Sequence, residues 1–154
     1  MINFLLSFSE LCKESFEKYK IKLPKNYKKI DNIIISGMGG SAIIGDVFLD
    51  VFGKELKIPV FINRSYELPK FASEKTLLIV VSYSGNTLET LKVLKDGIKR
   101  NCKIVGITSG GKMLKILKRK KLPYIEVEKN LVPRVSFVQM FIALVNIFVS
   151  VELR

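Results

Sequence analysis

Two short stretches of the sequence carry glycines and hydroxyl groups at spacings that suit an anion. In the first, residues 36–48 read SGMGGSAIIGDVF, which places glycine at positions 37, 39 and 40 before a helix expected to begin near Ser41. Glycine permits positive φ and removes the side chain that would keep a ligand away from the backbone. Because the start of a helix attracts anions, phosphate above all, we expect this turn to bind one.

The second stretch, residues 81–91, reads VSYSGNTLETL and carries hydroxyl groups where the first carries glycines. Ser82, Ser84 and Thr87 supply three hydroxyls, and Gly85 allows a ligand to approach the backbone. A dianionic phosphate monoester is bound by many such donors. The second stretch therefore predicts the other half of a phosphate site.

Helix capping is the alternative explanation for this second stretch. Asn86 and Glu89 fit the spacing of a capping box loosely, and serines favour turns for local reasons. Capping explains Asn86 or Thr87, but it does not explain Ser82 and Ser84 together with a glycine turn on a neighbouring strand.

The surrounding sequence predicts the elements that position both stretches. Short, β-branched apolar runs predict strands at 30–36, 58–62, 77–81, 103–108 and 124–127. Helical patterns lie between them at about 41–52, 87–100 and 112–120. Strands separated by helices indicate an α/β fold, a doubly wound five-stranded parallel sheet. In a flavodoxin-like strand order the first and third strands are adjacent, so the two stretches would face each other across the usual ligand crevice.

The two ends of the chain are predicted to be helices of different character. Residues 1–20 have apolar residues at helical spacing and predict an amphipathic helix that packs on the protein. Residues 135–152 are apolar nearly all round, which favours burial against the sheet and against another domain or subunit. Polar residues interrupt this run, so we expect no membrane span. At 154 residues the chain suits a single domain, 1–154.

The charge and the cysteine content limit the kinds of partner and metal ion that we expect. The net charge of +12 favours anionic partners, but the cations are scattered and the densest run is only residues 118–121, so we expect no nucleic-acid binding. Cys12 and Cys102 are too isolated for a disulfide framework, and without histidine the usual mixed metal-ligand sets are missing. We expect two reduced, buried cysteines, no metal and a cytoplasmic protein.

A dinucleotide site is a further alternative. Gly37, Gly39 and Ala42 fit the dinucleotide fingerprint, a match that is weak on its own. The fingerprint requires an acidic residue after the second strand, where this sequence has Asn63 and Arg64. Arg64 would instead suit a 2′-phosphate, which leaves an NADP-binding domain open.

Four sequence segments together resemble the sugar isomerase (SIS) domain, and most closely the archaeal-type bifunctional phosphoglucose/phosphomannose isomerases. They read GMGGSAIIGD, SYSGNTLET, NRSYELP and VPRVSF, in this order along nearly the whole chain. The resemblance implies isomerisation between glucose or mannose 6-phosphate and fructose 6-phosphate, through an enediolate. It brings Arg134 toward the reacting carbons, where a guanidinium would stabilise the developing oxyanion. The phosphate-binding residues that it implies are Gly39, Gly40, Ser41, Ser82, Ser84 and Thr87.

The sequence departs from this family in the groups that move protons. In the family a Glu and a His of a second SIS domain serve as base and ring-opening group, whereas this sequence contains no histidine. Three explanations stay open: part of a split enzyme, a short isomerase that uses its own carboxylates across a homodimer, or a non-catalytic sugar-phosphate-binding module. The partner would be a second copy or a complementary SIS half, and no cofactor is implied. The candidate carboxylates are Glu67, Glu89, Glu126 and Glu128.

Overall fold

The centre of the protein is a five-stranded parallel sheet with strand order β2-β1-β3-β4-β5. The computed structural model describes the backbone of residues 2–151 and the side chains of residues 7–151. This order places β1 beside β3, as the sequence predicted, and pairs Ser36 with Val80 near the carboxyl ends of the two strands. The strands are β1 (Asn32–Ser36), β2 (Val60–Asn63), β3 (Thr76–Val81), β4 (Lys103–Thr108) and β5 (Tyr124–Glu126).

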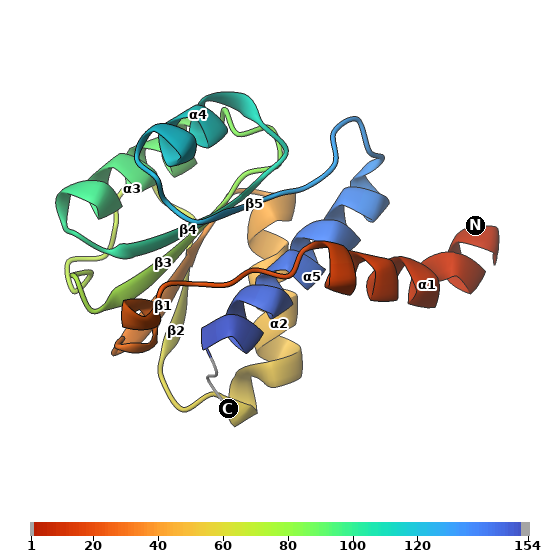
Figure 1. Ribbon diagram of the computed structural model, residues 1–154, viewed down its shortest axis with the longest axis horizontal. Coiled ribbons are helices and arrows are strands. Elements are labelled where there is room, and N and C mark those ends of the chain that lie inside the picture. The colour runs from red at the N-terminus through yellow and green to blue at the C-terminus, as the bar shows by residue number, and fades with distance from the viewer. Residues whose placement is uncertain (1, 152–154) are drawn as a thin grey trace.

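Helices cover both faces of the sheet (Figure 1). Helices α3 and α4 pack on one face, and α2 and α5 pack on the other, with α1 against α5. The α-helices are α1 (Ile2–Lys18), α2 (Gly40–Phe52), α3 (Leu88–Lys99), α4 (Gly111–Arg119) and α5 (Pro133–Val151). Two short 3-10 helices, η1 (Lys25–Lys28) and η2 (Gly53–Glu55), lie in the connections. The doubly wound α/β prediction is therefore confirmed.

The residues of β1 show why the strands are apolar throughout. Ile33 and Ile35 pack in the core beneath α2 and α5, whereas Ile34 packs in the core beneath α3 and α4. All three are fully buried. A strand whose two faces are both covered cannot alternate apolar and polar side chains, so it reads as a continuous hydrophobic run.

The boundaries of β2 differ from the sequence prediction for two reasons. The strand begins at Val60 rather than at residue 58, since Pro59 has no N–H to donate to the sheet. It extends to Asn63, which pairs with Ser36 at the end of β1. Asn63 thus belongs to the carboxyl edge where the candidate loops emerge.

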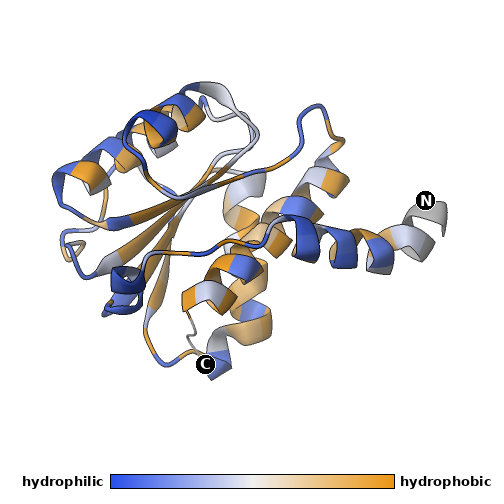
Figure 2. Ribbon diagram, viewed as in Figure 1, coloured by the Kyte–Doolittle hydropathy of each residue, from blue (hydrophilic) through white to orange (hydrophobic). Residues whose placement is uncertain are grey.

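Helix α5 is covered largely by its own chain. Its residues pack against β4, α2 and α1, and Figure 2 shows hydrophobic residues concentrated on α5, α2 and the strands. Among the described residues, α5 is the one helix that is long and apolar enough to cross a membrane, and 56% of its apolar 18-residue stretch is buried inside the protein. It begins at Pro133, which suits the first position of a helix, rather than at residue 135. The expected last residue, Glu152, lies outside the described residues.

Helix α1 packs less completely than its amphipathic pattern predicts. Ser15 and Tyr19 are buried, and the Asn146 side chain donates a hydrogen bond to the carbonyl of Phe16 at 2.9 Å. Figure 1 shows the N-terminal half of α1 projecting away from the sheet. Cys12 is consequently half-buried, so the prediction that both cysteines are buried is wrong for Cys12. The expected first residue, Met1, lies outside the described residues.

Candidate functional site

The loop after β1 packs directly against the end of β3. A Cβ atom at Gly37 would lie 2.9 Å from the carbonyl oxygen of Ser41 and 3.1 Å from that of Val81. Glycine is needed at position 37 because only a hydrogen atom fits between these carbonyls. The first glycine therefore brings the loop onto β3 and is explained by packing alone.

Gly39 and Gly40 have a different environment. Both are exposed, and a Cβ atom at either position would meet no described heavy atom within 4 Å. Gly39 precedes the first residue of α2 with φ +51, a conformation that favours glycine. The space beside the start of α2 is thus open to solvent, at the helix end that attracts anions. Ser41 lies half-buried in the first turn of α2.

The loop after β3 brings two of its predicted hydroxyl groups together. The Oγ atom of Ser82 lies 3.0 Å from Oγ1 of Thr87, and it also accepts a hydrogen bond from the N–H of Gly85 at 3.1 Å. Thr87 is the N-cap residue of α3, yet its side chain makes no capping hydrogen bond. The Thr87 hydroxyl therefore belongs to the loop and does not cap the helix.

Asn86 caps a different helix from the one that the sequence suggested. Its Oδ1 accepts a hydrogen bond from the backbone N–H of Lys112 in the first turn of α4, at 3.0 Å. The backbone N–H of Asn86 donates to Oγ of Ser84 at 3.2 Å, and the Ser84 side chain is exposed at the outer side of the loop. The capping-box explanation for α3 is therefore wrong, because Asn86 contacts a residue distant in sequence.

A third loop, after β4, supports the second stretch and was missed by sequence reasoning. A Cβ atom at Gly85, where φ is +66, would lie 1.9 Å from the carbonyl oxygen of Gly110. Ser109 donates to the carbonyl of Tyr83 from its N–H at 3.0 Å and from its hydroxyl at 2.7 Å. The signal for this support was the run SGG at residues 109–111, directly after the fourth predicted strand.

Arg134 is exposed and is the second residue of α5. The segment that leads to it contacts the loop after β3, because the N–H of Leu131 donates to the hydroxyl of Tyr83 at 2.9 Å. The start of α5 and the second loop thus lie at the same edge of the sheet. Leu131, three residues before Arg134, is thus tied to the side chain of Tyr83, which lies between Ser82 and Ser84 in the sequence.

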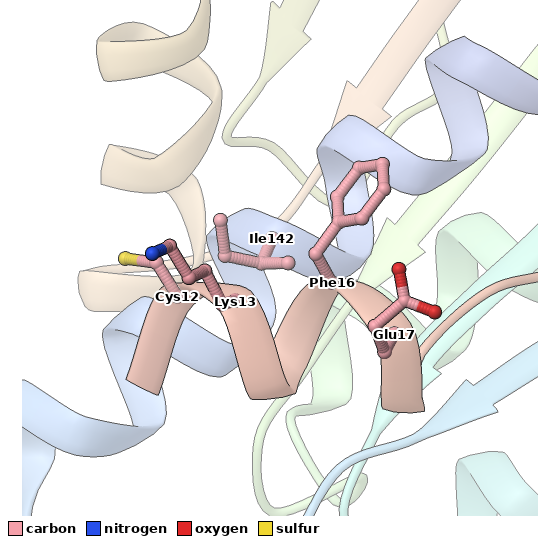
Figure 3. A pocket seen from close by; sticks show the side chains of 5 residues that line it. All are labelled: Cys12, Lys13, Phe16, Glu17 and Ile142. Atoms are coloured by element: carbon pink, nitrogen blue, oxygen red, sulfur yellow. The ribbon is translucent and has the colours of Figure 1, made fainter. Parts of the chain in front are cut away.

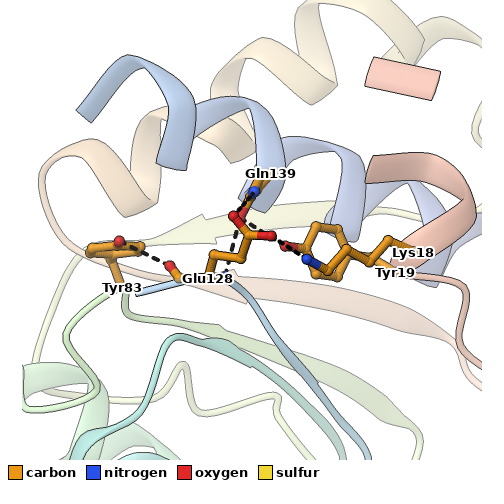
Figure 4. Close-up of polar contacts among 5 residues, drawn as sticks. All are labelled: Lys18, Tyr19, Tyr83, Glu128 and Gln139. Atoms are coloured by element: carbon orange, nitrogen blue, oxygen red, sulfur yellow. Dashed lines mark hydrogen bonds and ion pairs between the residues drawn. The ribbon is translucent and has the colours of Figure 1, made fainter. Parts of the chain in front are cut away.

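Glu128 is held in a network of polar contacts, shown in Figure 4. Its carboxylate pairs with Lys18 and accepts a hydrogen bond from Nε2 of Gln139 at 3.2 Å. The Lys18 ammonium, followed by Gln139, holds the pKa of the Glu128 carboxyl below its usual range. A carboxylate with a lowered pKa is a weaker base, so Glu128 is poorly suited to proton abstraction.

The other candidate carboxylates also have structural surroundings that explain them. Glu126 lies 3.6 Å from the ammonium of Lys118, and Glu89 is hydrogen bonded to Tyr66, which raises the pKa of the Tyr66 hydroxyl. Glu67 is exposed. None of these observations marks one of the three as a catalytic base.

The dinucleotide alternative meets an obstacle at the end of β2. Arg64 forms an ion pair with Asp46 of α2, so its guanidinium is engaged by the protein. The side-chain amide of Asn63 donates to Oγ of Ser36 at 3.3 Å. These contacts hold the end of β2 against β1 and α2. In a dinucleotide-binding domain the ribose would lie at this end of β2.

A shallow pocket lies elsewhere, between α1 and α5 (Figure 3). Its lining comes from these two helices and includes no residue of the loops after β1 and β3. Within the described part of the chain, no group of three His, Cys, Asp or Glu residues is placed to bind a metal ion. The residues that line the pocket are Cys12, Lys13, Phe16, Glu17 and Ile142.

A family model and individual relatives of known name both match this chain. Residues 26–149 match the family described as SIS domain. The chain is 36% identical over 154 residues to a bifunctional phosphoglucose/phosphomannose isomerase of Caldicellulosiruptor bescii, covering 99% of this chain and 45% of that protein. It is also 36% identical over 141 residues to a D-glucosamine-6-phosphate 4-epimerase of Sulfolobus acidocaldarius, covering 90% of this chain and 44% of that protein. The chain thus spans about half the length of these curated relatives.

Solved structures share the fold at low sequence identity. The C-terminal domain of glucosamine-fructose-6-phosphate aminotransferase from Francisella tularensis superposes with a TM-score of 0.75 at 17% identity, covering 99% of this chain and 48% of that one. The Vibrio vulnificus NanR protein complexed with ManNAc-6P superposes with a TM-score of 0.64 at 18% sequence identity. The match covers 94% of this chain and 59% of the NanR chain. Both likenesses concern the fold.

Proposed function

The chain belongs to the SIS domain family, and from this premise we propose that it is the phosphate-holding part of a sugar-phosphate aldose–ketose isomerase. Its substrates would be glucose or mannose 6-phosphate and fructose 6-phosphate. The relatives named as phosphoglucose/phosphomannose isomerases support this substrate class, and the NanR complex with ManNAc-6P supports phosphosugar binding by the fold.

One observation carries the proposal: two loops that bear hydroxyl side chains emerge from adjacent strands at one edge of the sheet. Gly39 and Gly40 leave space beside the start of α2 that none of the described heavy atoms fills. Across the β1–β3 junction, Ser82 and Thr87 direct their hydroxyls at each other instead of at the helix that follows. In our proposal, a phosphate monoester lies between these loops and accepts hydrogen bonds from Ser41, Ser82, Ser84 and Thr87 and from the Gly39 and Gly40 backbone.

Arg134 is proposed to act on the sugar rather than on the phosphate. Isomerisation moves a proton between two adjacent carbons and develops negative charge on an enediolate oxygen. A fixed guanidinium at the same edge would stabilise that oxyanion. As a cation at the N-terminal end of α5, Arg134 opposes the helix dipole, which favours a functional reason for its presence.

The proton-transfer groups are proposed to come from a partner, either a second copy of this chain or a complementary SIS half. Glu128 is tied to Lys18 and Gln139, and the sequence contains no histidine to open a sugar ring. A second copy would add carboxylates across the interface but no histidine, whereas a complementary SIS half would supply the Glu and the His of the family. We propose that the protein works in the cytoplasm, as a metabolic enzyme of this class would.

A phosphorus NMR time course of fructose 6-phosphate with a stoichiometric amount of purified protein tests this proposal. A shift of the phosphate signal reports binding, and new aldose-phosphate signals report turnover. Binding supports the proposed phosphate site, and turnover extends the proposal to catalysis by this chain or its homo-oligomer. An unchanged phosphate signal at millimolar fructose 6-phosphate would contradict it.

A further inference from the structure

Tyr83 joins the proposed phosphate loop to the segment that precedes Arg134. Its hydroxyl donates a hydrogen bond to the carbonyl of Glu128 at 2.9 Å and accepts one from the N–H of Leu131 at 2.9 Å. Tyr83 also lies between Ser82 and Ser84 in the chain. One phenol thus contacts both ends of residues 128–131, which lead into α5. Figure 4 shows its contact with Glu128.

The backbone of Tyr83 is itself fixed. Its carbonyl accepts two hydrogen bonds from Ser109, one from the N–H at 3.0 Å and one from the hydroxyl at 2.7 Å. The loop after β4 therefore anchors Tyr83, and its side chain is only partly exposed. The phenol therefore joins residues 128–131 to a fixed point of the loop after β3.

The far side of the same segment is held by α1 and α5. Gln139 is 4% exposed, and its Oε1 accepts hydrogen bonds from the N–H of Glu128 at 3.1 Å and from the Tyr19 hydroxyl at 2.8 Å. Lys18 pairs with the Glu128 carboxylate. These contacts fix Glu128 to the body of the protein, whereas the Tyr83 hydroxyl also holds Leu131, three residues before Arg134.

We infer that Tyr83 is a positioning residue, whose hydroxyl sets the place of Arg134 relative to the phosphate loop. The inference rests on the proposed function, because it concerns the same site. Tyr83 acts through residues 128–131 and has no role in proton transfer. It aligns the group that meets the sugar with the group that meets the phosphate, and such alignment lowers the barrier to reaction.

A double-mutant cycle tests this inference with two probes, inorganic phosphate and a hydroxamate phosphate that mimics the enediolate. Tyr83→Phe should leave the affinity for inorganic phosphate within about twofold and weaken the hydroxamate phosphate by about tenfold, in the usual range of coupling between sites. Arg134→Ala should weaken the hydroxamate phosphate by about tenfold in the wild type, but by less than about twofold in the Tyr83→Phe background. Tyr124→Phe is the matched control, since Tyr124 contacts Lys118 through its ring and contacts neither loop by its hydroxyl.

The outcomes separate the inference from the proposed function. Additive losses from Tyr83→Phe and Arg134→Ala overturn the inference and leave the phosphate site intact. Equal weakening of both probes by Tyr83→Phe also overturns it, because the phenol would then shape the phosphate loop itself. A wild-type protein that binds neither probe overturns the proposed function and the inference with it.

A measurement on the wild type keeps the test decisive if Tyr83→Phe fails to fold. The Leu131 amide donates to the Tyr83 hydroxyl, so its hydrogen exchange reports whether that hydrogen bond opens. The hydroxamate phosphate should slow Leu131 exchange by about fivefold or more, within the usual range of coupling between sites. Unchanged exchange at Leu131 in the bound protein contradicts a link between phosphate loop and Arg134.

Discussion

The hydroxyl oxygens of Ser82 and Thr87 lie 3.0 Å apart across the turn that joins β3 to α3. Each is a residue type that commonly caps a helix, yet Thr87 makes no capping hydrogen bond to α3. The two hydroxyls bond to each other inside the loop, where Ser82 also accepts from the Gly85 N–H and is buried, while Thr87 is half-buried. In our proposal a phosphate monoester reaches this pair from the side of Thr87.

Ser84 is the exposed residue among the four predicted hydroxyl ligands of the phosphate, so it gives the cleanest test of the phosphate assignment. Ser84→Ala should weaken fructose 6-phosphate binding by about tenfold, since a hydrogen bond to a charged group contributes about 1.5–3 kcal/mol. Binding of fructose, which lacks the phosphate, should change little. Isothermal titration of both sugars checks this, with Ser9→Ala on α1 as the control. Equal losses for the two sugars would remove Ser84 from the phosphate site.

Gly40 allows binding to be separated from stability. A methyl group at position 40 meets no described heavy atom within 4 Å, and Ala favours a helix over Gly by up to about 1 kcal/mol. Gly40→Ala should therefore preserve or raise the melting temperature while it weakens fructose 6-phosphate binding, because the methyl occupies the ligand space. Thermal unfolding and titration of the same sample measure both. Unimpaired binding by this variant would show that the ligand does not approach Gly40.

Gly39→Ala is the comparison for that experiment, because it should lose stability as well as binding. Gly39 has φ +51, and a side chain in such a conformation costs about 1–3 kcal/mol. A lower melting temperature for Gly39→Ala than for Gly40→Ala is expected. If the two variants melted alike, the strained turn before α2 would be absent in solution.

Arg134 should matter more for the reaction intermediate than for the substrate. Arg134→Ala is expected to weaken the hydroxamate phosphate by about tenfold and fructose 6-phosphate by less, since electrostatic stabilisation acts where charge develops. Competition binding of the two ligands measures the difference. Arg119→Ala is the control, because Arg119 is the last residue of α4 and lies at the end of that helix remote from the loop after β4. Equal weakening of both ligands would limit Arg134 to positioning the substrate.

Glu128 predicts a pH dependence of stability. The Lys18 contact, followed by that of Gln139, lowers the pKa of the Glu128 carboxyl in the folded state, so its stabilisation is present above the unfolded pKa and is lost as pH falls through the folded pKa. Both partners are about half-exposed, so the effect should be below about 1 kcal/mol.

Urea unfolding of Glu128→Gln at several pH values measures this contribution. The variant should be less stable than the wild type at pH 7, and the difference should shrink as pH falls through the lowered pKa of Glu128 in the folded state. Glu10→Gln, on the exposed side of α1, is the control. A difference between Glu128→Gln and the wild type that stayed constant as the pH was lowered would exclude the ion pair as its source.

The sequence predicted what depends on local pattern. Continuous β-branched runs such as residues 33–35 indicated strands buried on both faces, and the spacing of strands and helices indicated the doubly wound sheet. The order of the strands placed both candidate loops at one edge. These features follow from the residue composition of each segment and from the spacing of its apolar residues, which are properties of the local sequence.

The features that the sequence did not predict depend on contacts between distant residues. Asn86 looked like a cap for the helix that follows it, but its amide reaches Lys112 on α4. Cys12 belongs to the apolar face of the predicted N-terminal helix. It is only half-buried, because the N-terminal half of α1 projects away from the sheet. The tie from Tyr83 to Leu131 spans 48 residues and has no local signature.

The most direct test of the central claim is a two-dimensional amide NMR titration with fructose 6-phosphate, which identifies the residues that the ligand contacts. The account predicts that the amide signals of Gly39, Gly40, Ser41 and Gly85 shift together and saturate with one dissociation constant, while those of Cys12 and Phe16 in the α1–α5 pocket stay in place. Shifts confined to the α1–α5 pocket, with the four loop amides unmoved, would contradict it.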